Sequence, residues 1–225
     1  MRLLFVNPNS TDSMTDKVRQ TARNVLPSTI DVVACSNLQG PASIQGSADG
    51  ELAIPGMLNV IRGEIERGLD GIVIACFDDT GIDQVRTLTD RPVLGIGQAA
   101  YHASMLAGHT FSVVTTLSIS VPVLEQNVRA FGVHPYCCNI RASEVPVLEL
   151  ERPGSDAEIR ISAEIATALV EDQCEAIVLG CAGMTDLAAR LSDTHKVPVI
   201  DGVAAAAGLV YGLALVSAQS DRKFR

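Results

Sequence analysis

The chain has 225 residues, is rich in aliphatic residues, and contains 18 glycines and no tryptophan. This length allows one large or two small domains with a sizeable hydrophobic core. A net charge of −9 argues against nucleic acid or anionic membranes as partners, since both attract basic surfaces. We therefore expect no nucleic-acid partner and no membrane partner.

The N-terminal sequence MRLLFVNPNS has one charge and an apolar run too short for a signal peptide, so we expect a cytoplasmic protein. The six cysteines are expected to be free thiols, because the chain has a large core and no export signal. The sequence contains no CxxC or HExxH motif and no His/Cys cluster at ligand spacing. We expect neither a metal nor another cofactor.

The first half of the chain is predicted to alternate strands and helices. Short apolar runs indicate buried strands, and apolar residues three to four apart indicate amphipathic helices. The first strand ends in the turn Asn7–Thr11, whose short polar side chains suit a helix start. Strands are expected at Arg2–Val6, Thr29–Ser36, Ile72–Ile74 and Arg91–Ile96, and helices at Asp12–Val25, Ala53–Leu69, directly after Cys76 and at Gln98–Ala107, with a loop at Gln39–Ser47.

The second half repeats this order. Strands are expected at Phe111–Thr116, Cys137–Ala142, Ile177–Leu179 and Val197–Gly202, and helices at Val121–Phe131, Asp156–Glu171, up to Leu191 and through Val216, before a frayed tail at Ser217–Arg225. The repeat predicts two pseudo-symmetric, doubly wound α/β domains with parallel flavodoxin-like or Rossmann-like sheets and an active site in the cleft between them. We place the first domain at residues 1–98 plus 205–225 and the second at 99–204, because the helix after each proline-led strand is expected to cross to the other half.

Two cysteines occupy corresponding places in the repeat. Cys76 follows the strand Ile72–Ile74, and Cys181 follows Ile177–Leu179. Ligands bind at the carboxyl ends of the strands in open α/β sheets, which is where both cysteines lie. A free cysteine is most often a small buried hydrophobe, but the repeat places these two on opposite walls of one cleft. Adjacent helix N-termini are expected to lower the pKa of each thiol.

A thiolate on one face of a carbon and a thiol on the other can remove a proton and return one to the opposite face, which is two-base racemisation. The carbanion would need hydrogen-bond donors at the neighbouring carbonyl. Backbone N–H groups after the cysteines and hydroxyls at the sheet edge could supply them. The residues expected to bind substrate are Asn9, Pro41, Ser43, Phe77, Asp78, Thr115, Thr116, Ala182 and Gly183.

Three alternatives stay open at this point. Asp78 and Asp79 could bind a metal or work as paired acids, although adjacent carboxylates near a helix start more often cap it. A histidine could activate a cysteine nucleophile, although none of the four histidines lies in a repeated motif. Duplicated α/β halves with a hinge also describe non-catalytic small-molecule binding proteins, which have no need of paired thiols.

Seven motifs occur in order: NPNST at Asn7–Thr11, GPASIQG at Gly40–Gly46, ACFDDTG at Ala75–Gly81, FSVVTT at Phe111–Thr116, PGSD at Pro153–Asp156, LGCAGM at Leu179–Met184 and VPVIDGVAAA at Val197–Ala206. With them the chain resembles the hydantoin racemase branch of the aspartate/glutamate racemase superfamily over nearly its whole length. The resemblance implies a cofactor-independent racemase of 5-monosubstituted hydantoins, with Cys76 and Cys181 as the acid/base residues, in a homo-oligomer.

The turns after the cysteines differ from those of the superfamily's amino-acid racemases, which have CNT and CTH where this chain has CFD and CAG. The difference removes groups that would hold an α-amino acid and suits a neutral cyclic imide. Allantoin racemase is the alternative within the branch, since allantoin is a 5-ureido hydantoin. Its members usually have GDPG where this chain has Asp78–Gly81, which favours hydantoin racemase. The loop Gly40–Ser47 and Phe77 are expected to face the 5-substituent.

Overall fold

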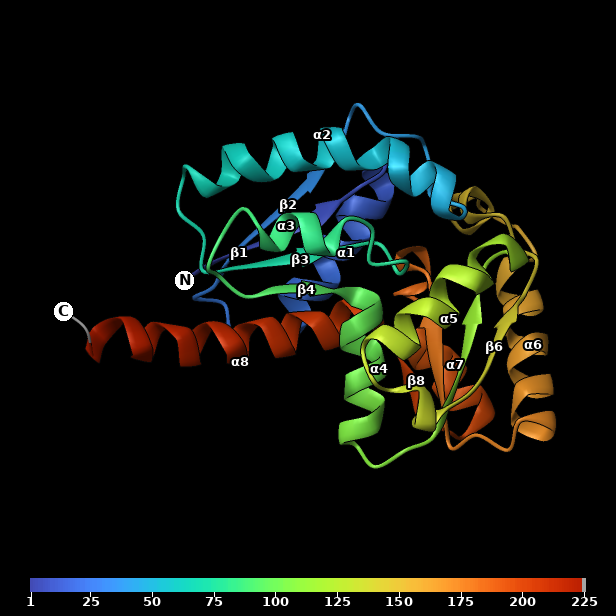
Figure 1. Cartoon of the computed structure of the whole chain (residues 1–225). Helices are drawn as coiled ribbons and strands as arrows, with labels where there is room; N and C mark the ends of the chain where they lie inside the picture. Colours follow the sequence, from blue (N-terminus) through green and yellow to red (C-terminus); the bar gives the residue numbers. More distant parts are fainter. Residues whose placement is uncertain (224–225) are drawn as a thin grey trace.

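The computed structural model describes residues 1–223, with side chains described as far as residue 218. It contains two sheets of four parallel strands each, in the orders β2-β1-β3-β4 and β6-β5-β7-β8. The first sheet consists of β1 Arg2–Asn7, β2 Asp31–Ser36, β3 Gly71–Ile74 and β4 Val93–Gly95. The second consists of β5 Phe111–Thr115, β6 Cys137–Ala142, β7 Ala176–Gly180 and β8 Val199–Ile200. The identical strand order confirms the predicted pair of similar α/β domains (Figure 1).

Helices flank both sheets. The α-helices are α1 Asp12–Val25, α2 Ser47–Ile65, α3 Ile82–Arg86, α4 Ile96–Leu106, α5 Val121–Ala130, α6 Ala157–Glu171, α7 Ala188–His195 and α8 Gly202–Lys223. The 3₁₀ turns are η1 Ser118–Ser120, η2 His134–Tyr136, η3 Val147–Glu151 and η4 Ala182–Met184. Across the described residues, no helix is long and apolar enough to cross a membrane.

Several helix boundaries differ from the sequence prediction, most clearly at the start of α2 and the end of α8. Helix α2 begins at Ser47, earlier than predicted, because Gly46 adopts a φ of 93° and turns the chain directly into the helix. The predicted frayed tail is wrong as far as Lys223, since α8 continues through it. Its last two positions, 224–225, lie outside the described residues.

The strands form because their residues are apolar on both faces. On one face of the first sheet, Leu4 and Ile72 pack with Met57 of α2. On the other face, Phe5 and Val73 pack with side chains of α8. Burial of both faces is typical of parallel sheets and explains the continuous apolar runs.

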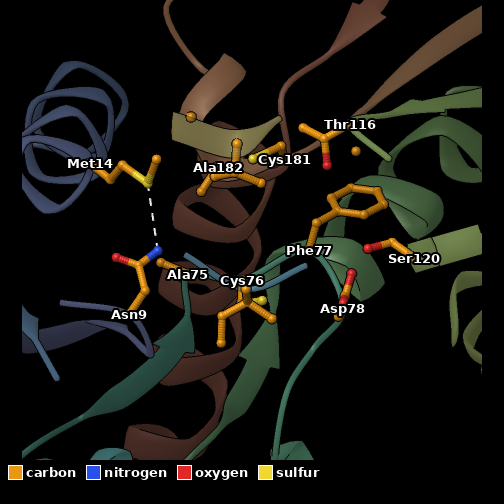
Figure 2. A pocket seen from close by; sticks show the side chains of 14 residues that line it. Asn9, Met14, Ala75, Cys76, Phe77, Asp78, Thr116, Ser120, Cys181 and Ala182 are labelled. Atoms are coloured by element: carbon orange, nitrogen blue, oxygen red, sulfur yellow. Dashed lines mark hydrogen bonds between the residues drawn. The ribbon is translucent and has the colours of Figure 1, made fainter. Parts of the chain in front are cut away.

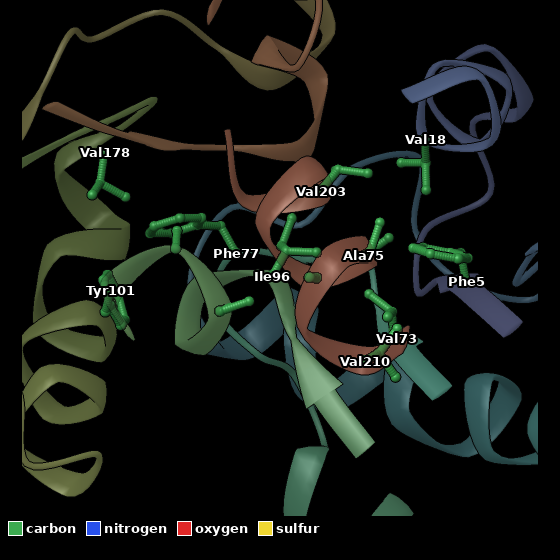
Figure 3. Packing of buried hydrophobic residues seen from close by; sticks show 14 of the residues in the cluster. Phe5, Val18, Val73, Ala75, Phe77, Ile96, Tyr101, Val178, Val203 and Val210 are labelled. Carbon is green, nitrogen blue, oxygen red and sulfur yellow. The ribbon is translucent and has the colours of Figure 1, made fainter. Parts of the chain in front are cut away.

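One core connects the two domains. It includes Phe5 and Val73 of the first sheet, Val178 of the second sheet, and Val210 of α8 (Figure 3). Helix α8 follows the last strand of the second sheet, yet it packs on α1, β3 and α4. The chain therefore crosses between its halves, and the exact domain boundaries at residues 98 and 204 stay a prediction.

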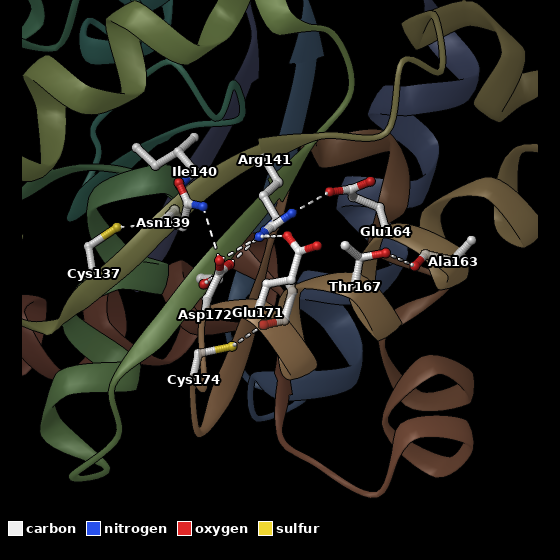
Figure 4. Close-up of polar contacts among 12 residues, drawn as sticks. Cys137, Asn139, Ile140, Arg141, Ala163, Glu164, Thr167, Glu171, Asp172 and Cys174 are labelled. Atoms are coloured by element: carbon white, nitrogen blue, oxygen red, sulfur yellow. Dashed lines mark hydrogen bonds and ion pairs between the residues drawn. The ribbon is translucent and has the colours of Figure 1, made fainter.

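An ion-pair network in the second domain links β6 to the C-terminal end of α6 (Figure 4). Arg141 of β6 pairs with Asp172 at 2.6 Å and with Glu171 at 2.7 Å. The Ser112 hydroxyl donates to Asp172 at 2.8 Å. Hydrogen bonding by Arg141 lowers the pKa of Asp172 to about 2, so this carboxylate is a structural anion.

Candidate active site

The two cysteines converge on one pocket at the carboxyl edge of the sheets. Strand β3, which lies beside β1, leads to Cys76. Strand β7, which lies beside β5, leads to Cys181. In each sheet the chain leaves these two neighbouring strands in opposite directions. The divergence opens a crevice between them, and doubly wound sheets bind ligands in this crevice. Both cysteines line the same pocket of about 400 Å³ (Figure 2).

The thiols have similar backbone surroundings. The backbone N–H of Asp78 acts to lower the pKa of Cys76, and the backbone N–H of Gly183 acts to lower that of Cys181. Each of these N–H groups comes two residues after its cysteine, so the pseudo-symmetry repeats this effect. Cys76 also accepts the hydroxyl of Thr80 at 3.4 Å.

Both thiols hold their protons more firmly than the sequence predicted. Burial raises the pKa of Cys181 to about 12 and that of Cys76 further, and the charge of Asp78 adds to both increases. The predicted lowering of the thiol pKa values by helix N-termini is wrong. Helix α3 begins only at Ile82 and α7 only at Ala188, and only the short 3₁₀ turn η4 directly follows Cys181, so no α-helix N-terminus adjoins either thiol.

Asp79 has a structural role in the turn after Cys76. Its carboxylate accepts the backbone N–H groups of Gly97 at 2.9 Å and Gln98 at 2.7 Å, so it caps the first turn of α4. The expected capping role is confirmed for Asp79 alone of the two carboxyls, and the capped helix is α4 rather than the next one in the chain. Asp201 caps α8 in the same way, through the N–H groups of Val203 and Ala204.

Asn9 presents a hydrogen-bond donor to the pocket. Its side-chain oxygen accepts Asn7 Nδ2 at 2.8 Å and the N–H of Thr11 at 2.9 Å. These contacts fix the amide so that, among the described residues, Nδ2 bonds only to the sulfur of Met14, at 3.5 Å. A ring carbonyl in the pocket would be a better acceptor than this thioether.

The opposite side of the pocket is also polar. Figure 2 shows Asp78, Thr116 and Ser120 across from Asn9 and Met14. Burial raises the pKa of Asp78 to about 7. Asp78 Oδ2 is buried and has no hydrogen-bond partner among the described residues, which makes it available to a ligand.

Most of the expected substrate-binding residues line this pocket. They are Asn9, Phe77, Asp78, Thr116, Ala182 and Gly183. Phe77 is only 3% exposed, and its ring packs edge-on against Tyr101 with the centroids 5.4 Å apart, so its contribution as an apolar wall is small.

Three expected residues are absent from the pocket lining in the described part of the chain: Pro41, Ser43 and Thr115. The carbonyl of Pro41 accepts the backbone N–H of Ser10 at 2.9 Å. The hydroxyl of Thr115 donates to the carbonyl of Gly180 at 3.0 Å. These two residues therefore support the walls of the site, and Ser43 is buried in the loop between Pro41 and α2.

The structure adds an apolar cover that sequence reasoning missed in part. Ile44 of the loop before α2 and Val147 of η3 both line the pocket. Gln45 Oε1 accepts the backbone N–H of Val147 at 3.1 Å, so the loop of one domain is tied to the other. The loop was expected to face the substituent, but nothing in the sequence pattern pointed to Val147.

The geometry defines a class of protein: a two-domain α/β chain in which two thiols from equivalent strand ends share one small pocket. Among the described residues that line the pocket, none is lysine or arginine. The described residues also contain no group of three His, Cys, Asp or Glu side chains placed to hold a metal ion.

The Asp/Glu/Hydantoin racemase family model matches residues 3–210, and the chain belongs to this family. The hydantoin racemase of Rhizobium meliloti is 45% identical over 213 residues, covering 95% of this chain and 88% of the relative. The hydantoin racemase of Pseudomonas sp. strain NS671 is 41% identical, covering 91% and 82%. The structure of allantoin racemase from Klebsiella pneumoniae aligns with a TM-score of 0.93 at 37% identity, covering 96% of this chain and 89% of that one. The chain is accordingly a racemase, an isomerase acting on small molecules.

Proposed function

We propose that this racemase inverts C5 of 5-monosubstituted hydantoins without a cofactor, using Cys76 and Cys181 as its two bases. The observation that carries the proposal is the convergence of these thiols, from equivalent strand ends, on one pocket. A single base cannot serve both faces of a carbon, whereas a pair on opposite walls can.

In the proposed reaction the ring lies between the sulfurs. One cysteine, as thiolate, takes the proton from C5, and the electrons move onto the C4 carbonyl to give an enolate. The other cysteine, as thiol, returns a proton to the opposite face of C5. Donors such as Asn9 Nδ2 and the hydroxyls of Thr116 and Ser120 would stabilise the enolate oxygen.

Two observations support a neutral ring over an amino acid as substrate. The described lining contains no lysine or arginine, and Lys17 beside it is paired with Glu151 at 2.9 Å, so a substrate carboxylate would have no free counter-charge. Asp78 would repel it further. Between hydantoins and allantoin, the higher identity to hydantoin racemases and the apolar cover from Ile44 and Val147 favour a hydantoin with a hydrocarbon substituent.

The continuous core also disfavours the alternative of a hinged, non-catalytic binding protein. Phe77, Tyr101 and Phe111 form a run of ring contacts from the Cys76 turn through α4 to β5, with centroid separations of 5.4 and 5.8 Å. Opening the cleft by a hinge would break this packing. A fixed pocket suits chemistry that requires two groups at set positions.

Polarimetry of the purified protein with L-5-benzylhydantoin, S-allantoin and L-glutamate, in EDTA and without added cofactor, tests this proposal. Decay of rotation to zero with the benzyl compound alone is the expected result. Decay with allantoin alone would move the activity to allantoin, and no change with all three would favour a binding protein.

The homo-oligomer implied by the sequence resemblance and the cytoplasmic location stay predictions. Light scattering on the eluting protein would measure the first, and fractionation of the source cells would determine the second.

A further inference from the structure

The pocket departs from its own pseudo-symmetry at one position. Two residues after Cys76 the chain has Asp78, whereas two residues after Cys181 it has Gly183. Both residues line the pocket, and their backbone N–H groups have the same lowering effect on the pKa of the neighbouring thiol. One wall thus carries a carboxyl group that the other lacks.

The carboxyl group of Asp78 faces the pocket without a fixed partner. Its Oδ2 atom is buried and makes no hydrogen bond within the described residues. The side chain also borders a neighbouring pocket that Asp79 lines too, but the side-chain oxygens of Asp79 are held by the N–H groups of Gly97 and Gln98. Such an unsatisfied buried acid needs an explanation, and the reaction supplies one.

Two-base racemisation requires one thiolate and one thiol, and therefore one negative charge among the ionisable groups of the pocket. Burial holds the protons on Cys76 and Cys181 well above neutral pH, since their pKa values lie at about 12 or higher. Burial raises the pKa of Asp78 only to about 7, so among Asp78 and the two cysteines Asp78 loses its proton first.

Building on the function proposed above, we propose that Asp78 accepts the proton that a cysteine must give up and then, as a carboxylic acid, donates a hydrogen bond to the enolate oxygen of the ring. A buried carboxylic acid that donates to an enolate is an established way to stabilise it. Asp78 would then be a third catalytic residue, present on only one side of the pocket.

The proton balance closes within the site. The Asp78 carboxylate and a cysteine thiol become a carboxylic acid and a thiolate. The thiolate takes the C5 proton, and the electron pair of the broken C–H bond forms the enolate, whose oxygen accepts the acid's O–H. The second cysteine protonates C5 from the other face, so the negative charge ends on that cysteine and no external reagent is consumed.

Other charged groups near these atoms are fixed or balanced. Asp79 beside Asp78 accepts the N–H groups of the helix that it caps, while burial raises its pKa to about 8, and the Tyr101 hydroxyl is deeply buried with its pKa raised. Near Cys181, Lys17 pairs with Glu151 at 2.9 Å, and their opposite effects on the thiol partly cancel. Asp79 is committed to its cap, so the ionisable groups that face a ligand together are Asp78 and the two cysteines.

Alkylation of the cysteines tests the proton exchange without any substrate. Iodoacetamide rates at Cys76 and Cys181 would be followed by peptide mass spectrometry in the wild type, Asp78→Asn and the exposed control Asp83→Asn. In the wild type and the control, a thiolate forms when a cysteine passes its proton to ionised Asp78, and this exchange does not depend on pH once Asp78 has ionised. Their alkylation rates should therefore be flat between about pH 7.5 and 9. In Asp78→Asn the rates should rise about tenfold per pH unit. Parallel profiles in wild type and Asp78→Asn would overturn the proposal.

Racemisation kinetics test the hydrogen bond to the enolate. Asp78→Ala should lower kcat at least about 100-fold, as loss of an oxyanion donor does. Asp78→Asn keeps an N–H donor and should stay within about tenfold of wild type near pH 7, with a rate that rises with pH. Equal losses in both variants would overturn the donor role. Failure of the wild type to racemise any hydantoin would refute the proposed function instead, and the alkylation profile would still decide whether Asp78 exchanges protons with the cysteines.

Discussion

The Asp79 cap connects the stability of the fold to the position of Cys76. Asp79 lies three residues after Cys76 with a φ of 52°, and its two carboxylate oxygens accept the N–H groups of Gly97 and Gln98 on α4. The side chain fills space that exists because residue 95 is glycine, since a Cβ on Gly95 would lie 1.8 Å from Asp79 Oδ1. Removing the carboxylate should therefore loosen both α4 and the cysteine turn.

The size of the effect follows from two contributions. Loss of a helix cap costs up to about 2 kcal/mol, and leaving a buried N–H unsatisfied costs about 1–3 kcal/mol. We expect Asp79→Ala to lower the free energy of unfolding by about 3 kcal/mol. Asp79→Gly loses the same hydrogen bonds but tolerates the positive φ, so it should be about 1 kcal/mol more stable than Asp79→Ala.

Urea unfolding followed by circular dichroism measures these differences, with Asp83→Ala as the exposed control. Asp79→Asn keeps one acceptor and should fall between wild type and Asp79→Gly. If Asp79→Ala unfolded within about 0.5 kcal/mol of wild type, the carboxylate would not be the cap that the geometry indicates. Equal stabilities of the Ala and Gly variants would show that the positive φ carries no cost.

Three further predictions concern other contacts. Asp172 has a folded pKa of about 2 against an ordinary 3.8, so it contributes about 2 kcal/mol that is present above about pH 4 and lost as the pH falls toward 2. Asp172→Asn should lower stability at pH 7 by about this amount but not at pH 2, as measured by thermal unfolding at the two pH values. Gln45→Ala breaks the tie to Val147 and should raise KM several-fold with a smaller change in kcat; an unchanged KM would refute the cover. Thr80→Val removes a hydrogen bond to the thiol and should slow alkylation of Cys76 relative to Cys181, whereas equal slowing at both would contradict it.

The repeated strand order and the position of the cysteines could be predicted from the sequence because both depend on local pattern. Apolar runs such as Ile72–Ile74 specify buried parallel strands, and a residue just after such a strand must lie at the carboxyl edge of the sheet. Polar residues directly after β1, such as Asn9, reach the pocket for the same reason.

Other features depend on contacts that a local pattern does not contain. Thr115 and Thr116 are adjacent, so their side chains point to opposite sides of the strand, and only the packing of Gly180 decides which hydroxyl is used internally. The contact between Gln45 and Val147 joins residues distant in sequence. Burial raises the pKa of Cys76, and burial is not visible in a local pattern. The lowering expected from a helix N-terminus is lost because α3 begins several residues further on.

Hydrogen–deuterium exchange at C5 of single enantiomers tests the central claim most directly. In D₂O, Cys76→Ser and Cys181→Ser each keep one thiol, so each variant should exchange the C5 proton of one enantiomer only, without racemising it. The two variants should select opposite enantiomers, and proton NMR of the C5 signal measures this. Exchange of both enantiomers by one variant, or of neither by both, would contradict the assignment of Cys76 and Cys181 as the two bases.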